Sequence, residues 1–143
     1  MRPVSDVLGN FPVKLDDKSR IVLPAKLRGE LAACAYLGPG PDSCIFLLSK
    51  IQLDQHLKRI ADQPAGSKRS GAYNRMFKGN LVWHVPDKQG RIPIKSPLKE
   101  YAGLEREVVV LGLGDRQEIW DVARWRAYQD ANMEQYVQSI DML

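Results

Sequence analysis

A short polar segment occurs twice in this chain of 143 residues. LDDKSRIVLP spans residues 15–24 and PDKQGRIPIK spans residues 86–95, so the second copy begins 71 residues after the first. In both copies an aspartate stands four residues before an arginine, and isoleucine follows that arginine directly. Because a chain of this length forms a single domain of ordinary size, the duplication predicts two similar halves that share one core.

Apolar and polar residues alternate on both sides of each copy. Alternation over a few residues indicates a half-buried β-strand, and two such strands around a polar turn indicate a β-hairpin. The apolar positions are Phe11, Val13, Leu15, Ile21 and Leu23 in the first half, and Leu81, Trp83, Val85, Ile92 and Ile94 in the second. We therefore expect one hairpin in each half, with the motif at its turn.

The elements that follow each hairpin are repeated as well. A short helix is expected in each half, opened by Pro24 in the first and by Ser96 as N-cap in the second. Two strands and a second helix come next, the helix being capped by Ser49 with Gln52 in the first half and starting at Asp121 in the second. The expected strands are 34–37, 45–48, 108–113 and 118–120.

These patterns divide the chain into a first repeat half at 8–61, a connection at 62–77, a second repeat half at 78–129 and a tail at 130–143. The connection is basic and rich in turn formers, and we expect it to include a short helix, since Tyr73, Met76 and Phe77 fit one face. The tail is expected to be helical because four of its apolar residues fit one stripe. They are Met133, Tyr136, Val137 and Ile140. A stripe of this kind packs on the body of the protein or on a neighbour.

Charge is distributed unevenly along the chain. The net charge is +4, but residues 1–100 contain 17 Lys and Arg against 9 Asp and Glu, whereas residues 101–143 contain 4 against 8. A basic body suggests an anionic partner, most often nucleic acid, although a solvated basic surface fits composition alone equally well. No apolar run approaches the length of a membrane span, and the first residues lack the apolar core of a secretory signal. We therefore expect a cytoplasmic protein with no membrane partner.

The two motifs have a direct physical interpretation. An aspartate at a turn accepts backbone N–H groups, and Asp16 and Asp87 are placed to form ion pairs with Arg20 and Arg91. One interpretation is that each pair only staples its turn. The other is a double-stranded DNA interface, because a two-stranded ribbon fits the major groove, a held arginine can specify a base and lysines contact phosphates. The supporting basic residues are Lys14, Lys18, Lys26, Arg28, Lys88, Lys95 and Lys99.

Residues for catalysis or metal binding do not fall into any recognisable set. Cys34 and Cys44 match neither a zinc ligand spacing nor a redox pair, and His56 and His84 are far apart in the sequence without nearby ligands. We expect both histidines at the surface and all three tryptophans in the core. The interpretation is a protein that is not an enzyme and has no metal, no cofactor and no small-molecule substrate.

The segment LDDKSRIVLPAKLRGEL resembles the leading motif of the swapped-hairpin transcription factors related to AbrB. The two-copy layout is similar to one branch of that family over essentially the whole chain, including YAGLEREVVVLGLGDRQEIWDVARW at 101–125. The resemblance implies a mainly β fold with short helices (α+β), a tandem duplicated swapped-hairpin AbrB-like barrel with pseudo-twofold symmetry. It also implies the functional residues Asp16, Arg20, Asp87 and Arg91.

The same resemblance implies a nucleoid-associated transcriptional regulator. Members of this branch form closed homo-oligomeric rings and bind short direct repeats in the promoter region of the division and cell-wall gene cluster, which includes their own gene. This sequence departs from the family where Ser19 replaces the usual glycine, a change expected to alter the first turn because serine adopts positive φ reluctantly. The alternative that remains open is an oligomeric structural or protein-interaction scaffold with only non-specific affinity for nucleic acid.

Overall fold

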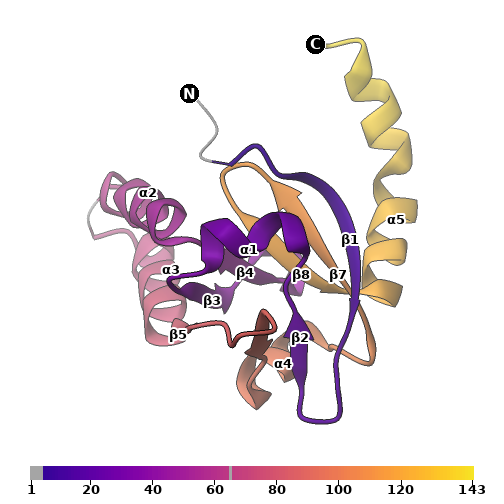
Figure 1. The fold of residues 1–143 in the computed structure, drawn as a ribbon. Helices are drawn as coiled ribbons and strands as arrows, with labels where there is room; N and C mark the ends of the chain where they lie inside the picture. Colours follow the sequence, from indigo (N-terminus) through magenta and orange to yellow (C-terminus); the bar gives the residue numbers. More distant parts are fainter. Residues whose placement is uncertain (1–4, 65) are drawn as a thin grey trace.

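The computed structural model describes residues 5–64 and 66–143 and confirms a mixed α+β fold built from two similar halves (Figure 1). The first half contains β1 (Leu8–Lys14), β2 (Arg20–Val22), α1 (Ala25–Leu31), β3 (Ala35–Pro39), a 3-10 turn η1 (Pro41–Ser43), β4 (Ile45–Leu48) and α2 (Lys50–Ala61). Next in the chain come α3 (Lys68–Gly79), β5 (Val82–His84), β6 (Arg91–Pro93), α4 (Ser96–Ala102), β7 (Glu107–Leu113), β8 (Gln117–Asp121) and α5 (Val122–Ile140).

The strands interleave the two halves. The larger sheet has the order β1-β7-β8-β4-β3-β5, and β2 pairs with β6 in a separate two-stranded ribbon. In each half the strand before the motif therefore pairs with the other half, β1 with β7 and β5 with β3. The central pair β4–β8 also joins the halves, so the topology has the pseudo-twofold symmetry that the repeat predicts.

The prediction of a local hairpin in each half is wrong. β1 and β2 flank the first motif but do not pair with each other; β1 is antiparallel to β7, and β2 is antiparallel to β6. The register places Ile21 opposite Ile92, and both side chains are fully buried. Alternation in the sequence gives the buried face of a strand but not its partner, and pairing across the halves buries these two isoleucines against each other.

One core serves both halves. It includes equivalent residues on the strand-to-helix segments, namely Leu23, Leu27 and Leu31 in the first half and Ile94, Leu98 and Ala102 in the second. Burying each large aliphatic side chain contributes roughly 1.5 to 3 kcal/mol, so neither half could keep its share of this core without the other. The shared core fixes the β2–β6 ribbon to the rest of the molecule.

The large sheet is open rather than a closed barrel, which corrects one part of the expected architecture. Within the described part of the chain, β1 and β5 are its edges and each has a neighbour on one side only. Pro12 lies on β1 and removes one backbone donor from that edge. The same residue range contains no helix long and apolar enough to cross a membrane.

The helices follow the sequence patterns with small shifts. Ser49 and Gln52 form the expected capping box, and α3 carries Phe77 into a buried cluster. Lys95, not Ser96, is the N-cap of α4, because the helix includes Ser96 as its first residue. The expected tail helix is the direct continuation of α5, which begins after Asp121 and ends at Ile140.

Two aromatic predictions are wrong. Trp83 lies on the outer side of the edge strand β5 and is mostly exposed, because the alternating residues Val82 and His84 face inward instead. His56 is half-buried against Phe46 and Phe77 rather than at the surface. Burial of His56 is decided by α3, because Tyr73 and Phe77 on that helix pack against its ring.

Candidate nucleic-acid interface

The first motif is a tight turn closed by one aspartate. The backbone N–H of Asp16 donates to the Arg20 carbonyl, and the N–H of Ser19 donates back to the Asp16 carbonyl. One carboxylate oxygen of Asp16 accepts the backbone N–H groups of Lys18 and Arg20, each at 2.9 Å. The other accepts Nε of Arg20 at 2.8 Å. The aspartate therefore fixes both the turn and the guanidinium.

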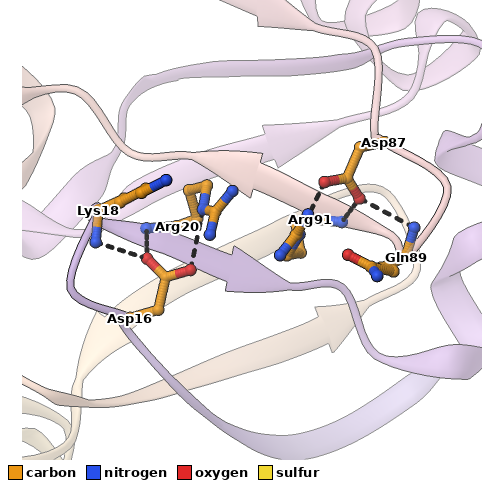
Figure 2. A network of polar contacts seen from close by, with 6 residues as sticks. All are labelled: Asp16, Lys18, Arg20, Asp87, Gln89 and Arg91. Atoms are coloured by element: carbon orange, nitrogen blue, oxygen red, sulfur yellow. Dashed lines mark hydrogen bonds and ion pairs between the residues drawn. The ribbon is translucent and has the colours of Figure 1, made fainter.

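The second motif repeats this geometry at positions 71 residues later. One carboxylate oxygen of Asp87 accepts the backbone N–H groups of Gln89 and Arg91 at 2.9 Å, and the other accepts Nε of Arg91 at 2.7 Å. Figure 2 shows the two clusters at opposite ends of the β2–β6 ribbon, each aspartate beside its own arginine. The expected ion pairs are thus present in both copies.

These hydrogen bonds hold both carboxylates in the charged form. The backbone N–H of Arg20 is the main cause that lowers the pKa of Asp16 below its ordinary value of 3.8. The backbone N–H of Arg91 lowers the pKa of Asp87 in the same way, followed by the side chain of Arg91. A carboxylate that accepts several N–H bonds favours ionisation. Both ion pairs are therefore intact at neutral pH.

The arginines keep donors for a ligand. Each ion pair uses Nε, and among the described residues neither terminal nitrogen of Arg20 or Arg91 makes a hydrogen bond within the protein. The two side chains are about one third exposed or slightly less. A guanidinium fixed at Nε presents its terminal N–H groups in one orientation, which suits recognition of two acceptors such as O6 and N7 of guanine.

On the outer face of the ribbon each arginine lies opposite an apolar residue of the other strand. The register pairs Arg20 with Pro93 and Val22 with Arg91, while the intervening isoleucines face the core. Val22 is 42% exposed although it is aliphatic. This exposure agrees with the alternation in the sequence, which places Arg20 and Val22 on the face opposite Ile21, because residues two apart share a face of a strand.

Each turn is also braced by the helix of the other half. Lys99 on α4 donates from Nζ to the hydroxyl of Ser19 at 3.0 Å. Arg28 on α1 occupies the equivalent place beside Gly90, where a Cβ would lie 2.9 Å from Arg28 Nε. The same nitrogen donates to the Leu23 carbonyl at 3.1 Å. The second turn thus leaves room for Arg28, and the first offers a hydroxyl to Lys99.

Ser19 takes the backbone conformation that its position demands. Its φ of 57° is left-handed, and Gly90, its counterpart in the second motif, has φ of 77°. The turn is therefore not altered by the serine; the two motifs have the same hydrogen bonds. The left-handed conformation costs a non-glycine residue about 1 to 2 kcal/mol, and the bond from Lys99 offsets part of that cost.

The other predicted basic residues lie around the ribbon with different partners. Lys14 is 3.9 Å from Glu107 on the neighbouring strand, and both side chains are exposed. Lys99 and Arg28 form the braces described above, so part of their donor capacity is used inside the protein. The four remaining predicted lysines are exposed at the surface; they are Lys18, Lys26, Lys88 and Lys95. DNA contact by any of them stays a prediction.

Comparisons with known proteins identify the family of this chain. The family model described as "MraZ protein, putative antitoxin-like" matches residues 76–140, which include the second motif. A transcriptional regulator MraZ from Kocuria rhizophila is 43% identical over 121 residues, 85% of each chain. The chain belongs to the MraZ family. MraZ proteins from Micrococcus luteus, 41% identical over 85% of each chain, and Saccharopolyspora erythraea, 39% over 92%, carry the same name.

The likeness to these MraZ proteins spans most of the chain in both directions. All of them are named transcriptional regulators. Family membership is in keeping with an α+β fold related to AbrB, and it supports a role in the regulation of transcription.

Proposed function

We propose that this chain is a sequence-specific DNA-binding transcriptional regulator that reads the major groove with its β2–β6 ribbon. The observation that carries the proposal is the pair of identical clusters in which Asp16 and Asp87 hold Arg20 and Arg91 by Nε. Turn stapling alone requires only the aspartates, which already bind the backbone of each turn. Fixing an arginine with its terminal donors free is useful to a ligand with paired acceptors.

The proposed target is a set of short direct repeats in the promoter region of the division and cell-wall gene cluster, including the gene of this protein. A head-to-tail ring of subunits presents the same ribbon repeatedly in the same sense, which suits direct repeats better than a palindrome. Several weak contacts on one duplex also reinforce each other through effective concentration. We therefore propose a closed homo-oligomeric ring on the nucleoid as the binding form.

The test is a mobility shift in a salt series, with DNA from upstream of the gene and a scrambled duplex of equal length. The Arg20→Ala, Arg91→Ala double variant removes both guanidiniums. An Arg20→Lys, Arg91→Lys variant is the matched control that keeps the charge but loses the paired donors. The proposal expects preferential binding of the native DNA that weakens steeply with salt, because phosphate contacts release counterions.

The outcomes separate the two interpretations of the motif. Loss of preference in both double variants, with assembly retained, supports base reading by the arginines. Full preference in the lysine variant would mean that charge alone is required and would overturn specific reading by a fixed guanidinium. Equal binding to both duplexes by the unmodified protein would leave a scaffold with non-specific affinity for nucleic acid.

A further inference from the structure

The two halves differ most in their last helices. Ser49 caps α2 and Asp121 caps α5 at equivalent positions, but α2 contains 12 residues and α5 contains 19. In the first half the chain turns back after α2, and α3 covers the outer face of the sheet with Phe77 in a buried cluster. In the second half α5 continues straight past the sheet (Figure 1).

The beginning of α5 is anchored and its end is not. Trp125 packs with the buried Trp120 on the outer face of β7 and β8, and Tyr128 stacks on Trp125. Beyond them the helix carries the tail stripe, which we define as Met133, Tyr136, Val137 and Ile140; each of these side chains is more than half exposed. A row of exposed apolar side chains at helical spacing marks an interaction surface.

An acidic row lies beside the tail stripe. Asp130, Glu134 and Asp141 follow one another at spacings that keep them on one side of the helix, and residues 127–143 contain no Lys or Arg. A surface suited to the end of α5 therefore has an apolar floor and a basic rim. This requirement excludes most of residues 101–143, where 8 Asp and Glu outnumber 4 Lys and Arg.

A hollow between α2 and α3 meets both requirements. Its volume is about 350 Å³, and its lining includes Ile60, Tyr73, Arg59 and Arg69. The Tyr73 hydroxyl is fixed 2.8 Å from Nε2 of His56, so the floor is already ordered. We call this surface the α2–α3 groove. Residues 58–79, which surround it, contain six Lys and Arg and a single acidic residue, Asp62.

The end of α5 cannot reach this groove within one molecule. Figure 1 shows α2 and α3 on one side of the molecule and α5 on the other, with the sheet between them. A contact between the two surfaces must therefore join two copies of the chain. Because the surfaces differ, the contact is head-to-tail, and repetition of such a contact by rotation closes a ring.

We propose that the tail stripe of one copy docks into the α2–α3 groove of a second copy, with the acidic row of α5 facing Arg59 and Arg69. This interface deepens the proposed function, since it rests on the ring invoked there and names the contact that forms it. Apolar side chains fill the groove and contribute most of the affinity, while the charges set the partner and its orientation.

Sedimentation velocity of the full chain tests the interface with variants in which the charges of the tail, of the groove, or of both are reversed. The tail variant is Glu134→Lys with Asp141→Lys, the groove variant is Arg59→Glu with Arg69→Glu, and a third protein combines all four changes. A variant with Lys50→Glu and Arg106→Glu changes the net charge as much as the groove variant but lies at exposed positions outside both surfaces. The unmodified chain is expected to sediment well above the 16.1 kDa of one subunit.

The proposal expects each of the tail and groove variants to fall to the mass of one subunit, while the combined protein regains the mass of the unmodified assembly. The Lys50→Glu, Arg106→Glu control keeps that mass. A monomeric unmodified chain, full assembly in both double variants, or a combined protein that stays dissociated would each overturn the interface.

The same proteins distinguish failure of the proposed interface from failure of the DNA proposal. Arg20 and Arg91 are unchanged in all of them, so a mobility shift reports DNA reading separately. Specific binding of the native duplex with intact assembly in both variants would reject the interface and leave the DNA proposal standing. Assembly that follows the charge exchange without any specific binding would support the interface and reject the DNA proposal.

Discussion

At the scale of single residues, the two aspartates link the turn to the arginine that it presents. Both carboxylates have a pKa below the ordinary value of 3.8, mainly through the backbone N–H groups of Arg20 and Arg91. A folded-state pKa that is depressed stabilises the folded state above the unfolded pKa, and this stabilisation disappears as the pH falls through the folded value. The stabilisation from these two carboxylates is therefore lost below about pH 4.

Carboxyl carbon chemical shifts followed by NMR in a pH titration measure this effect directly. We expect the signals of Asp16 and Asp87 to have midpoints below 3.8, and the two turns to remain unchanged between pH 5 and 8. Asp16→Asn with Asp87→Asn serves as the reference that loses the charge. A midpoint at or above 3.8 for either aspartate would contradict the geometry of its turn.

Ser19 offers a second residue-scale prediction. Both Ser19→Ala and Ser19→Gly remove the hydroxyl that accepts from Lys99, but only alanine keeps the cost of the left-handed φ of 57°. The alanine variant is expected to be less stable than the glycine variant by about 1 kcal/mol. Urea denaturation compares the two, and an alanine variant at least as stable as the glycine variant would show that the turn relaxes to another conformation.

At the scale of elements, the β2–β6 ribbon depends on pairing between the halves. Each strand has three residues, too few for an independent hairpin, and the buried pair Ile21 and Ile92 fixes the ribbon to the core. The face that carries Arg20 and Arg91 is held in place by this pair beneath it. Stability of the whole domain and orientation of the ribbon are therefore coupled.

Truncation of one of these isoleucines tests the coupling. Ile21→Ala is expected to lower the free energy of unfolding by about 2 to 5 kcal/mol, because it opens a cavity in a fully buried layer. Val22→Ala is the matched control on the next residue, which is partly exposed and should change stability by about 0.5 kcal/mol or less. Similar effects of the two substitutions in thermal or urea unfolding would mean that the ribbon does not contribute to the core.

At the scale of the whole molecule, the sequence predicted the duplication, the order of elements and the two Asp–Arg pairs. It could do so because these features are local: alternation, capping residues such as Ser49, and a motif whose members are four residues apart. The partners of the strands were not predictable in this way. The register between Ile21 and Ile92 joins positions far apart in the chain, and local alternation carries no information about such pairing.

In the candidate site too, local features could be predicted from the sequence and long-range contacts could not. Arg20 and Arg91 could be named from the motif, whereas the braces from Lys99 to Ser19 and from Arg28 beside Gly90 require the interleaved topology. Lys99 and Arg28 were predicted to contact DNA; the fold gives each an internal contact as well, and their contact with DNA stays a prediction. The long-range placement of α1 and α4 against the opposite turn decides this difference.

Protection of guanine N7 from dimethyl sulfate on the promoter duplex tests the central claim most directly, since this atom lies in the major groove where the arginines are proposed to bind. The account predicts protected guanines at regularly repeated positions with the unmodified protein, and loss of protection with Arg20→Lys, Arg91→Lys at protein concentrations that still shift the duplex. Binding without any protected guanine would contradict major-groove reading by the paired arginines.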